Sequence, residues 1–218
     1  MKKVIIIGCG DIGLRVATLF RQQDYITSGL IRDHSKLNKL HASNIHPILY
    51  DLDCPTESMS SPLSSRDAIL YYFAPPDKKG DIDTRLRAFV SSISKDQLPD
   101  RIIYISTTGV YGNCDGAWIT EEMPPNPSTQ RSKRRMDAEK TLMKWHDCTN
   151  RPAIMLRVAG IYGPRRLPIE RIKNKTPVLL ENSSPYSNRI HEDDLAQACV
   201  KAAFYTGQHH IFNICDGH

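Results

Sequence analysis

The sequence predicts an α/β protein in which a doubly wound parallel sheet is covered by helices on both faces. Three observations predict it: short β-branched runs alternate with amphipathic segments, a glycine-rich turn follows the first run, and the composition is that of a globular chain. The 218 residues are 40% hydrophobic and 24% charged, which excludes collagen-like, coiled-coil and largely disordered chains. A chain of this length buries roughly 70% of its extended surface, so it needs no disulfide or metal staple.

Short apolar runs bounded by turn residues predict the strands. The first run, Lys3–Ile7, is β-branched and continuous, which is typical of a parallel strand buried on both faces. Pro75 and Pro76 end the fourth run, because proline cannot donate to a strand ladder. The predicted strands span residues 3–7, 26–31, 45–50, 68–73, 101–105, 152–158 and 211–214.

Apolar residues at helical spacing predict the covering helices. Leu86 and Phe89, for example, share one face of the segment 82–93. Ser128, which follows a proline, is the predicted N-cap of the fourth helix, and Asp193 begins the fifth, where a carboxylate offsets the helix dipole. The predicted helices span residues 14–20, 34–41, 82–93, 128–145 and 191–205, and the serine- and proline-rich segment 55–65 predicts neither helix nor strand.

The turn between the first strand and the first helix carries the strongest local motif. It reads Gly8-Cys9-Gly10-Asp11-Ile12-Gly13, a GxGxxG in the strand-to-helix context that dinucleotide binding requires. Gly8 would make the tight turn, Gly10 would let the backbone approach a pyrophosphate, and Gly13 would let helix and strand pack closely. The helix N-terminal amides of Asp11 and Ile12 would hold the phosphate charge. This motif predicts a Rossmann-type fold, and a glycine turn without a ligand is the alternative.

The end of the second strand bears on which dinucleotide binds. Arg32 offers a planar fork of donors that suits the 2′-phosphate of NADP. Asp33 follows at once, and an acidic residue here suits the ribose hydroxyls of NAD. Both residues could also be solvated loop charges. We expect NADP, with NAD as the alternative.

Charge and cysteine usage exclude several other classes. The net charge of +5 is modest, and the basic helix 128–145 lacks the interleaved aromatic residues that stack bases, so no nucleic acid is expected. No apolar run is long enough for a signal or a membrane span, and we expect a cytoplasmic protein. The six cysteines are widely spaced and predict free thiols, and no metal site is expected.

A series of further landmarks extends in order through the chain. They are Asp51-Leu52, Ala74-Pro75-Pro76, Ser106-Thr107-Thr108-Gly109-Val110-Tyr111-Gly112, Arg157 before Gly160-Ile161-Tyr162-Gly163-Pro164, and Arg189-Ile190-His191-Glu192-Asp193-Asp194-Leu195-Ala196. In this order they resemble the extended or atypical short-chain dehydrogenases/reductases of the NAD-dependent epimerase/dehydratase type. The resemblance implies that Asp51 and Leu52 lie beside the adenine, and that Ala74 and Pro75 line the cofactor ribose.

The resemblance also implies a catalytic unit of Ser or Thr, Tyr and Lys, with the tyrosine four residues before the lysine. Such a tyrosine transfers a proton, and the nearby lysine cation lowers its pKa. Thr107 matches the hydroxyl position, and Lys133 matches the lysine, which also holds the nicotinamide ribose. Thr129 takes the tyrosine position and is far too weak an acid, so the unit is non-standard. Tyr111 is a candidate replacement proton donor ahead of Tyr162, with packing as the alternative role.

The same resemblance implies a substrate pocket in the later part of the chain. Thr108, Arg165, Arg189 and His191 are the expected substrate-binding residues, and the arginines would suit an anionic group, with a basic surface loop as the alternative. We expect a dinucleotide-binding domain over residues 1–160. A small, incomplete substrate-binding region over 161–218 is expected to interleave with the last sheet elements.

The functional expectation is an NAD(P)-binding oxidoreductase or epimerase/dehydratase-like protein acting on a small carbonyl or sugar-like substrate. The alternative is a non-catalytic NADP(H)-binding sensor or regulatory protein, which the missing tyrosine motivates. A homodimer is a further expectation from the resemblance.

Overall fold

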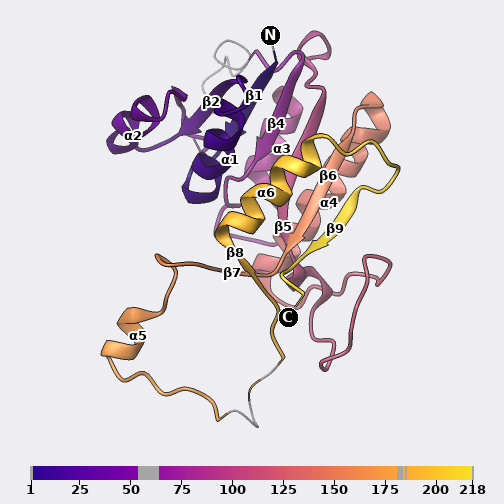
Figure 1. Cartoon of the computed structure of the whole chain (residues 1–218). Helices are drawn as coiled ribbons and strands as arrows, with labels where there is room; N and C mark the ends of the chain where they lie inside the picture. Colours follow the sequence, from indigo (N-terminus) through magenta and orange to yellow (C-terminus); the bar gives the residue numbers. More distant parts are fainter. Residues whose placement is uncertain (1, 54–63, 181–183, 185, 218) are drawn as a thin grey trace.

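The computed structural model describes residues 2–53, 64–180, 184 and 186–217 (Figure 1). Within these residues, seven parallel strands form one sheet in the order β3-β2-β1-β4-β5-β6-β9. The sheet thus grows from β1 to β2 and β3 on one side, and from β4 to β5, β6 and β9 on the other. This order confirms the predicted doubly wound fold. The strands are β1 (Lys3–Ile7), β2 (Ile26–Ile31), β3 (His46–Leu49), β4 (Ala68–Tyr72), β5 (Arg101–Thr107), β6 (Ala153–Val158) and β9 (Ile211–Ile214).

Helices cover both faces of this sheet (Figure 1). Successive side chains of β1 point to opposite faces, so Ile6 packs in one apolar cluster and Ile5 and Ile7 pack in the other. The first cluster includes residues of α1 (Asp11–Arg21), α2 (Leu37–Ala42) and α6 (Glu192–Ala203). The second includes residues of α3 (Thr84–Ser92) and α4 (Gln130–Thr149). Each fully buried isoleucine contributes roughly 1.5–3 kcal/mol, so the β-branched strands stabilise both layers.

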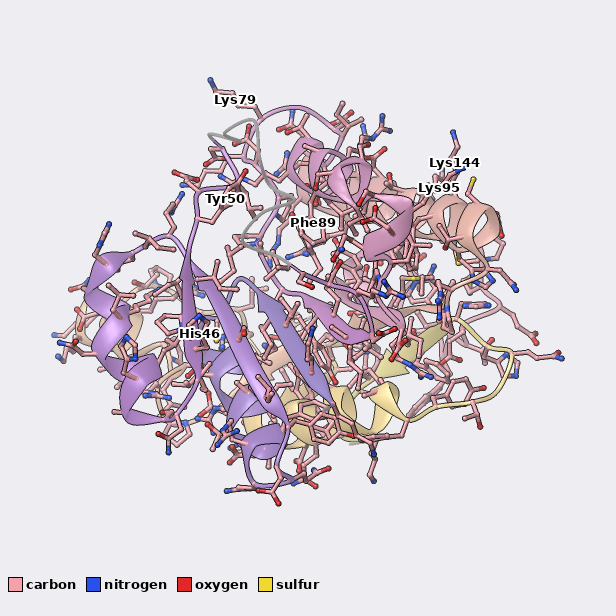
Figure 2. All side chains as sticks on the ribbon, turned by 90° about the horizontal axis from the view of Figure 1, so that it is seen from above. His46, Tyr50, Lys79, Phe89, Lys95 and Lys144 are labelled. Atoms are coloured by element: carbon pink, nitrogen blue, oxygen red, sulfur yellow. The ribbon has the colours of Figure 1, made fainter. Side chains whose placement is uncertain are left out.

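Figure 2 views the same layers from above. Phe89 lies on α3 and is buried, with its ring 5.3 Å from that of Tyr72 of β4. His46 marks the exposed edge strand β3, and Lys144 projects from α4 at the periphery. No described helix has the length and apolar character needed to cross a membrane.

The start of α4 differs from the prediction by one residue. Thr129, not Ser128, is the N-cap: its hydroxyl accepts from the Ser132 amide at 3.1 Å, and the Ser132 hydroxyl accepts from the Thr129 amide at 3.1 Å. This reciprocal capping box satisfies two amides that would otherwise lack partners. Thr129 therefore has a structural reason to stand where the resemblance places a tyrosine.

Two short strands and a short helix between β6 and α6 were not predicted. β7 (Gly160–Tyr162) and β8 (Arg189–His191) form a two-stranded parallel sheet, and α5 (Ile169–Lys173) lies between them in sequence. Figure 1 shows the segment with α5 extending away from the main sheet. Elements of three to five residues carry too little periodicity to be recognised. After β8 the chain rejoins the main fold: α6 packs on α1, and β9 pairs with β6.

A buried ion pair joins α4 to the sheet. The Arg157 side chain of β6 and the Glu139 side chain of α4 are each 2% exposed, and Arg157 Nη2 donates to Glu139 Oε2 at 2.8 Å. Ser106 of β5 also donates to this carboxylate. The Arg157 guanidinium lies 4.7 Å from the centre of the Tyr111 ring. One carboxylate thus connects α4 with two neighbouring strands close to their carboxyl ends.

We predict that Glu139→Gln lowers the free energy of unfolding by about 3–5 kcal/mol, because it leaves the Arg157 cation buried without a counter-charge. Urea denaturation measures this loss. The double variant Glu139→Leu with Arg157→Met removes both charges and is expected to lose less than the single variant. A Glu139→Gln protein as stable as the wild type would contradict the role assigned to the pair.

Candidate functional site

A cavity of about 560 Å³ lies where the sheet reverses its winding order, at the carboxyl ends of the strands. This is where open α/β sheets bind their ligands. Three segments that are distant in sequence form most of its wall: the glycine-rich turn after β1, the end of β5 with the following turn, and the start of α4. The lining residues are Gly8, Gly10, Asp11, Ile12, Gly13, Phe73, Ile105, Ser106, Thr107, Thr108, Gly109, Thr129, Arg131, Ser132, Arg135, Val158, Ala159, Gly160, Ile161 and Arg166.

The glycine-rich turn has the shape that a dinucleotide pyrophosphate requires. Gly8 has a φ of +85°, and a Cβ there would lie 2.5 Å from the Ala74 amide nitrogen, so only glycine fits. A Cβ at Gly10 would meet only the Gly8 carbonyl oxygen, at 4.0 Å, so its backbone faces open space. A Cβ at Gly13 would lie 3.1 Å from Ile6, which allows α1 to pack closely on β1. The close contacts at Gly8 and Gly13 fit the tight turn and the helix packing expected from the sequence, and the open space at Gly10 leaves room for a pyrophosphate.

The N-terminus of α1 leaves amides available to this cavity. Gly10 is the N-cap and has no side-chain cap, so the first-turn amides of Asp11, Ile12 and Gly13 have no capping partner. All three residues line the cavity. Amides at a helix N-terminus, together with the helix dipole, bind anions. The turn therefore fits a phosphate-bearing cofactor.

Asp11 in this turn is held by arginines from the segment after β7. Arg165 Nη2 donates to Asp11 Oδ1 at 2.7 Å, and Arg166 Nη2 donates to Asp11 Oδ2 at 3.1 Å. Partial burial works to raise the pKa of Asp11, but the Arg166 hydrogen bond and the charges of Arg165 and Arg15 outweigh it and lower the pKa below its usual value. Asp11 is therefore a carboxylate at neutral pH. The structure thus brings Arg165, an expected substrate-binding residue, to the cofactor turn.

Hydroxyl groups line the β5 side of the cavity. Ser106 donates to buried Glu139, and the Thr107 hydroxyl accepts from the Gly109 amide at 3.2 Å. Thr107 and Thr108, the expected catalytic and substrate-binding residues, both line the cavity. A hydroxyl both donates and accepts, so this wall can bind a carbonyl or alcohol oxygen.

Tyr111 does not reach the cavity. Its side chain is 3% exposed, its hydroxyl donates to Asn213 at 2.8 Å, and its ring packs against Arg157. This places the candidate proton donor in the packing between η3 (Thr108–Tyr111) and β9. Packing, the alternative role considered for Tyr111, is the arrangement that the structure has. Tyr162 is exposed on β7, with its ring beside His191.

Lys133 also lies outside the cavity. Its ammonium is 3.2 Å from Asp81, on the side of α4 that faces α3. The neighbouring Arg134 donates to the Gly80 carbonyl at 2.6 Å on that side. Positions 131, 132 and 135 of α4 line the cavity instead. Residues two positions apart in a helix lie on opposite sides, so Lys133 and Arg131 cannot face the same wall.

The residues expected around the adenosine lie beyond the cavity lining. The Arg32 side chain is 68% exposed, with Nη1 3.6 Å from Asp53 Oδ2. The Asp33 carboxylate accepts from the Ser35 amide at 2.9 Å and caps the short turn η1 (His34–Lys36), so it is engaged locally. Asp51 accepts from the Asp53 amide at 3.0 Å. Leu52, Ala74 and Pro75 follow β3 and β4, as the resemblance implies for residues near the adenine and ribose.

Of the remaining expected substrate residues, His191 has a capping role and Arg189 flanks the site. The His191 side chain accepts from the Asp193 amide at 3.3 Å and caps α6. The Arg189 guanidinium lies over the backbone of cavity-lining Gly160, where an added Cβ would meet it at 2.5 Å. Among the described residues, no group of three or more His, Cys, Asp or Glu could hold a metal ion.

Three cationic residues of the cavity were missed by sequence reasoning: Arg131, Arg135 and Arg166. Arg166 follows Arg165, the only residue of this basic pair that the sequence singles out. Arg131 and Arg135 lie in the basic segment 128–145, which is considered from sequence only as a surface for nucleic acid. The signal that could have found them is their spacing of four residues, which puts both on one side of a helix.

Comparison with known proteins agrees with this geometry. Residues 4–215 match the model of the NAD dependent epimerase/dehydratase family. A functionally unknown conserved protein from Silicibacter pomeroyi is similar in structure, with a TM-score of 0.79 and 26% identity over 100% of this chain and 73% of that one. The UDP-glucuronic acid 4-epimerase from Bacillus cereus, solved in complex with NAD, gives a TM-score of 0.81 at 21% identity, covering 100% of this chain and 78% of that one.

At 21% identity, the similarity to the Bacillus cereus epimerase shows the fold alone. A search of curated proteins found no match. The family match extends over nearly the whole chain and agrees with the sheet order and the glycine turn. The chain belongs to the NAD-dependent epimerase/dehydratase family.

Proposed function

We propose that this protein binds NADP(H) and acts as an oxidoreductase or epimerase-like enzyme on a small carbonyl or sugar-like substrate. One observation carries the proposal: a single cavity is bounded by the uncapped amides of the glycine turn, the hydroxyls at the end of β5 and the first turns of α4. In this proposal the amides bind the cofactor pyrophosphate. The hydroxyls bind the oxygen of the reacting carbon.

The preference for the phosphorylated cofactor rests on Arg32 and Asp33. An acidic residue at this place would bind ribose hydroxyls, and one oxygen of the Asp33 carboxylate accepts from the Ser35 amide. The Arg32 guanidinium is largely exposed, and its one ion pair with a described residue, Asp53, is long at 3.6 Å. An exposed ion pair of this kind contributes little, so Arg32 can turn to a 2′-phosphate at small cost.

When bound, the nicotinamide supplies or accepts a hydride at carbon. The protein's part is to orient the substrate and to handle the matching proton at oxygen. Thr107 and Thr108 can donate a hydrogen bond to that oxygen, and Ser106 lies beside them with its hydroxyl donating to Glu139. We propose that water exchanges the proton through this wall, in place of the family's tyrosine.

A second function is favoured by the composition of the lining. Its described members include no tyrosine, histidine, cysteine or lysine, and its one carboxylate, Asp11, is hydrogen-bonded to two arginines. A site without a general acid near neutral pH also suits a protein that binds the dinucleotide without turning it over. The alternative proposal is therefore an NADP(H)-dependent sensor.

We predict that NADPH and NADP⁺ stabilise the protein more than NADH and NAD⁺ at equal concentration. Ligand at about a hundred times its dissociation constant adds roughly 2.7 kcal/mol, or about 5–10 °C in thermal unfolding for a domain of this size. Arg32→Ala is expected to weaken NADPH binding about tenfold and to leave NADH binding unchanged, because it removes only the 2′-phosphate partner.

Two variants control this measurement. Lys144→Ala removes an exposed cation far from the turn and should change neither affinity. Gly10→Ala puts a methyl where the pyrophosphate must approach, and should weaken all four cofactors without unfolding the protein. No stabilisation by any of the four would overturn the cofactor proposal, and equal binding with no effect of Arg32→Ala would overturn the NADP preference.

The enzyme and the sensor differ in turnover. For the enzyme we expect product formation from at least one member of a panel of small aldehydes, ketones and sugars with NADPH, measured by cofactor consumption and product analysis. Gly10→Ala, which blocks the cofactor, should abolish it. Cofactor binding without conversion of any panel member would instead favour the sensor.

A further inference from the structure

The rotation of α4 presents two arginines, not a lysine, to the cavity. Arg131 and Arg135 are four residues apart, so their side chains lie on one side of the helix. Both line the cavity, with Ser132 between them. Lys133 is turned toward Asp81 on the other side. The family's tyrosine and lysine are four residues apart. In this chain, the two residues with that spacing that face the cavity are Arg131 and Arg135.

Guanidinium groups cannot replace tyrosine chemistry. An arginine guanidinium is not deprotonated in proteins, so it neither gives nor takes a proton near neutral pH. They are instead the side chains best suited to bind carboxylates and phosphates, through two parallel hydrogen bonds. Whatever Arg131 and Arg135 do in this cavity, they do it as fixed positive charges and hydrogen-bond donors.

Arg135 is positioned for such a role by the strand beneath it. It is 8% exposed, and its Nη1 donates to the Tyr104 hydroxyl and to the Ile105 carbonyl, each at 3.0 Å. No described residue accepts a hydrogen bond from its Nε or Nη2. The guanidinium is thus held on one side by β5, with donors still available on the other.

Arg131 has no counter-charge in the described part of the chain. It is exposed at the cavity wall, and no ion pair or hydrogen bond joins it to another described residue. The one carboxylate in the lining, Asp11, is already paired with Arg165 and Arg166 at the glycine turn. The α4 wall therefore has an excess of positive charge that no lining side chain neutralises.

We propose that Arg131, supported by Arg135, binds an oxyanion of the substrate, a carboxylate or phosphate, beside the hydroxyls of Thr107 and Thr108. The proposal rests on the function proposed above, because the glycine turn is assigned to the cofactor phosphates and the α4 wall is the second anion site. It narrows the substrate class to an anionic carbonyl or alcohol. The reacting oxygen would lie on the hydroxyl wall, with the anionic group on α4.

The test is binding of simple oxyanions to the protein saturated with NADPH, so that the glycine turn is occupied. Malonate tests for carboxylate binding, and inorganic phosphate tests for phosphate binding. Each is titrated by calorimetry, with chloride keeping the ionic strength constant. We expect saturable binding of at least one probe. Arg131→Gln should weaken it about tenfold or more, since a charge-assisted pair is lost. The probe that binds more tightly identifies the substrate group.

Three further variants make the result specific. Arg135→Lys keeps the charge but removes the planar fork, and is expected to weaken the probe less than Arg131→Gln. Lys144→Gln removes the same charge from the C-terminal half of α4 and should have no effect. Lys133→Gln removes it from the opposite side of the same turn, and should also leave probe binding unchanged.

The failures of the two proposals are separable. If NADPH binds but neither probe does, or if Lys133→Gln weakens the probe and Arg131→Gln does not, the oxyanion site is overturned and the cofactor proposal stands. Equal weakening by Arg131→Gln and Lys144→Gln would show a general charge effect and would also overturn it. Absence of NADPH binding to the wild type would overturn the proposed function itself.

Discussion

The rotational setting of α4 is the constraint on which the site depends, and one buried carboxylate fixes it. Glu139 is bonded to Arg157 of β6 and to Ser106 of β5, while Leu142 packs in the apolar cluster on the same face of the sheet. Because a helix repeats about every 3.6 residues, holding position 139 against the sheet also directs positions 135 and 131 to the strand ends. Lys133 is then necessarily directed toward α3.

The resulting cavity is lined mainly by groups that donate hydrogen bonds. One side has backbone amides, the next has hydroxyls, and the α4 side has guanidinium groups. Such a surface is suited to ligands that carry phosphates, carboxylates and carbonyl oxygens. Among its described lining residues there is no tyrosine, histidine, cysteine or lysine, and the one carboxylate, Asp11, is hydrogen-bonded to Arg165 and Arg166. In this family member, we infer that charge and positioning have a larger share in function than proton transfer by a side chain.

The parts of this account that the sequence could predict are local in the chain. The spacing of Gly8, Gly10 and Gly13 is a property of six consecutive residues, and the structure shows close packing at Gly8 and Gly13 and open space at Gly10. The doubly wound parallel sheet follows from alternating strands and helices and from the family landmarks. The paired strands β7 and β8 were missed because three residues carry no period.

The rest depends on contacts between distant residues. Matching landmarks placed Lys133 in the catalytic unit, but the face of α4 that meets the cavity is decided by packing against β5 and β6. The engagement of Asp11 by Arg165, 154 residues away, has no local signal. Tyr111 is a candidate proton donor from its place after β5. Only the fold shows that its hydroxyl donates a hydrogen bond to Asn213.

The most direct test of the account is a crystal structure of the protein with NADPH. We expect the pyrophosphate on the amides of Asp11–Gly13, the 2′-phosphate at Arg32 and the nicotinamide end beside Thr107, with Arg131 and Arg135 facing the remaining space and Lys133 still paired with Asp81. A cofactor bound elsewhere, or a Lys133 side chain turned into the site to hold the nicotinamide ribose, would contradict it.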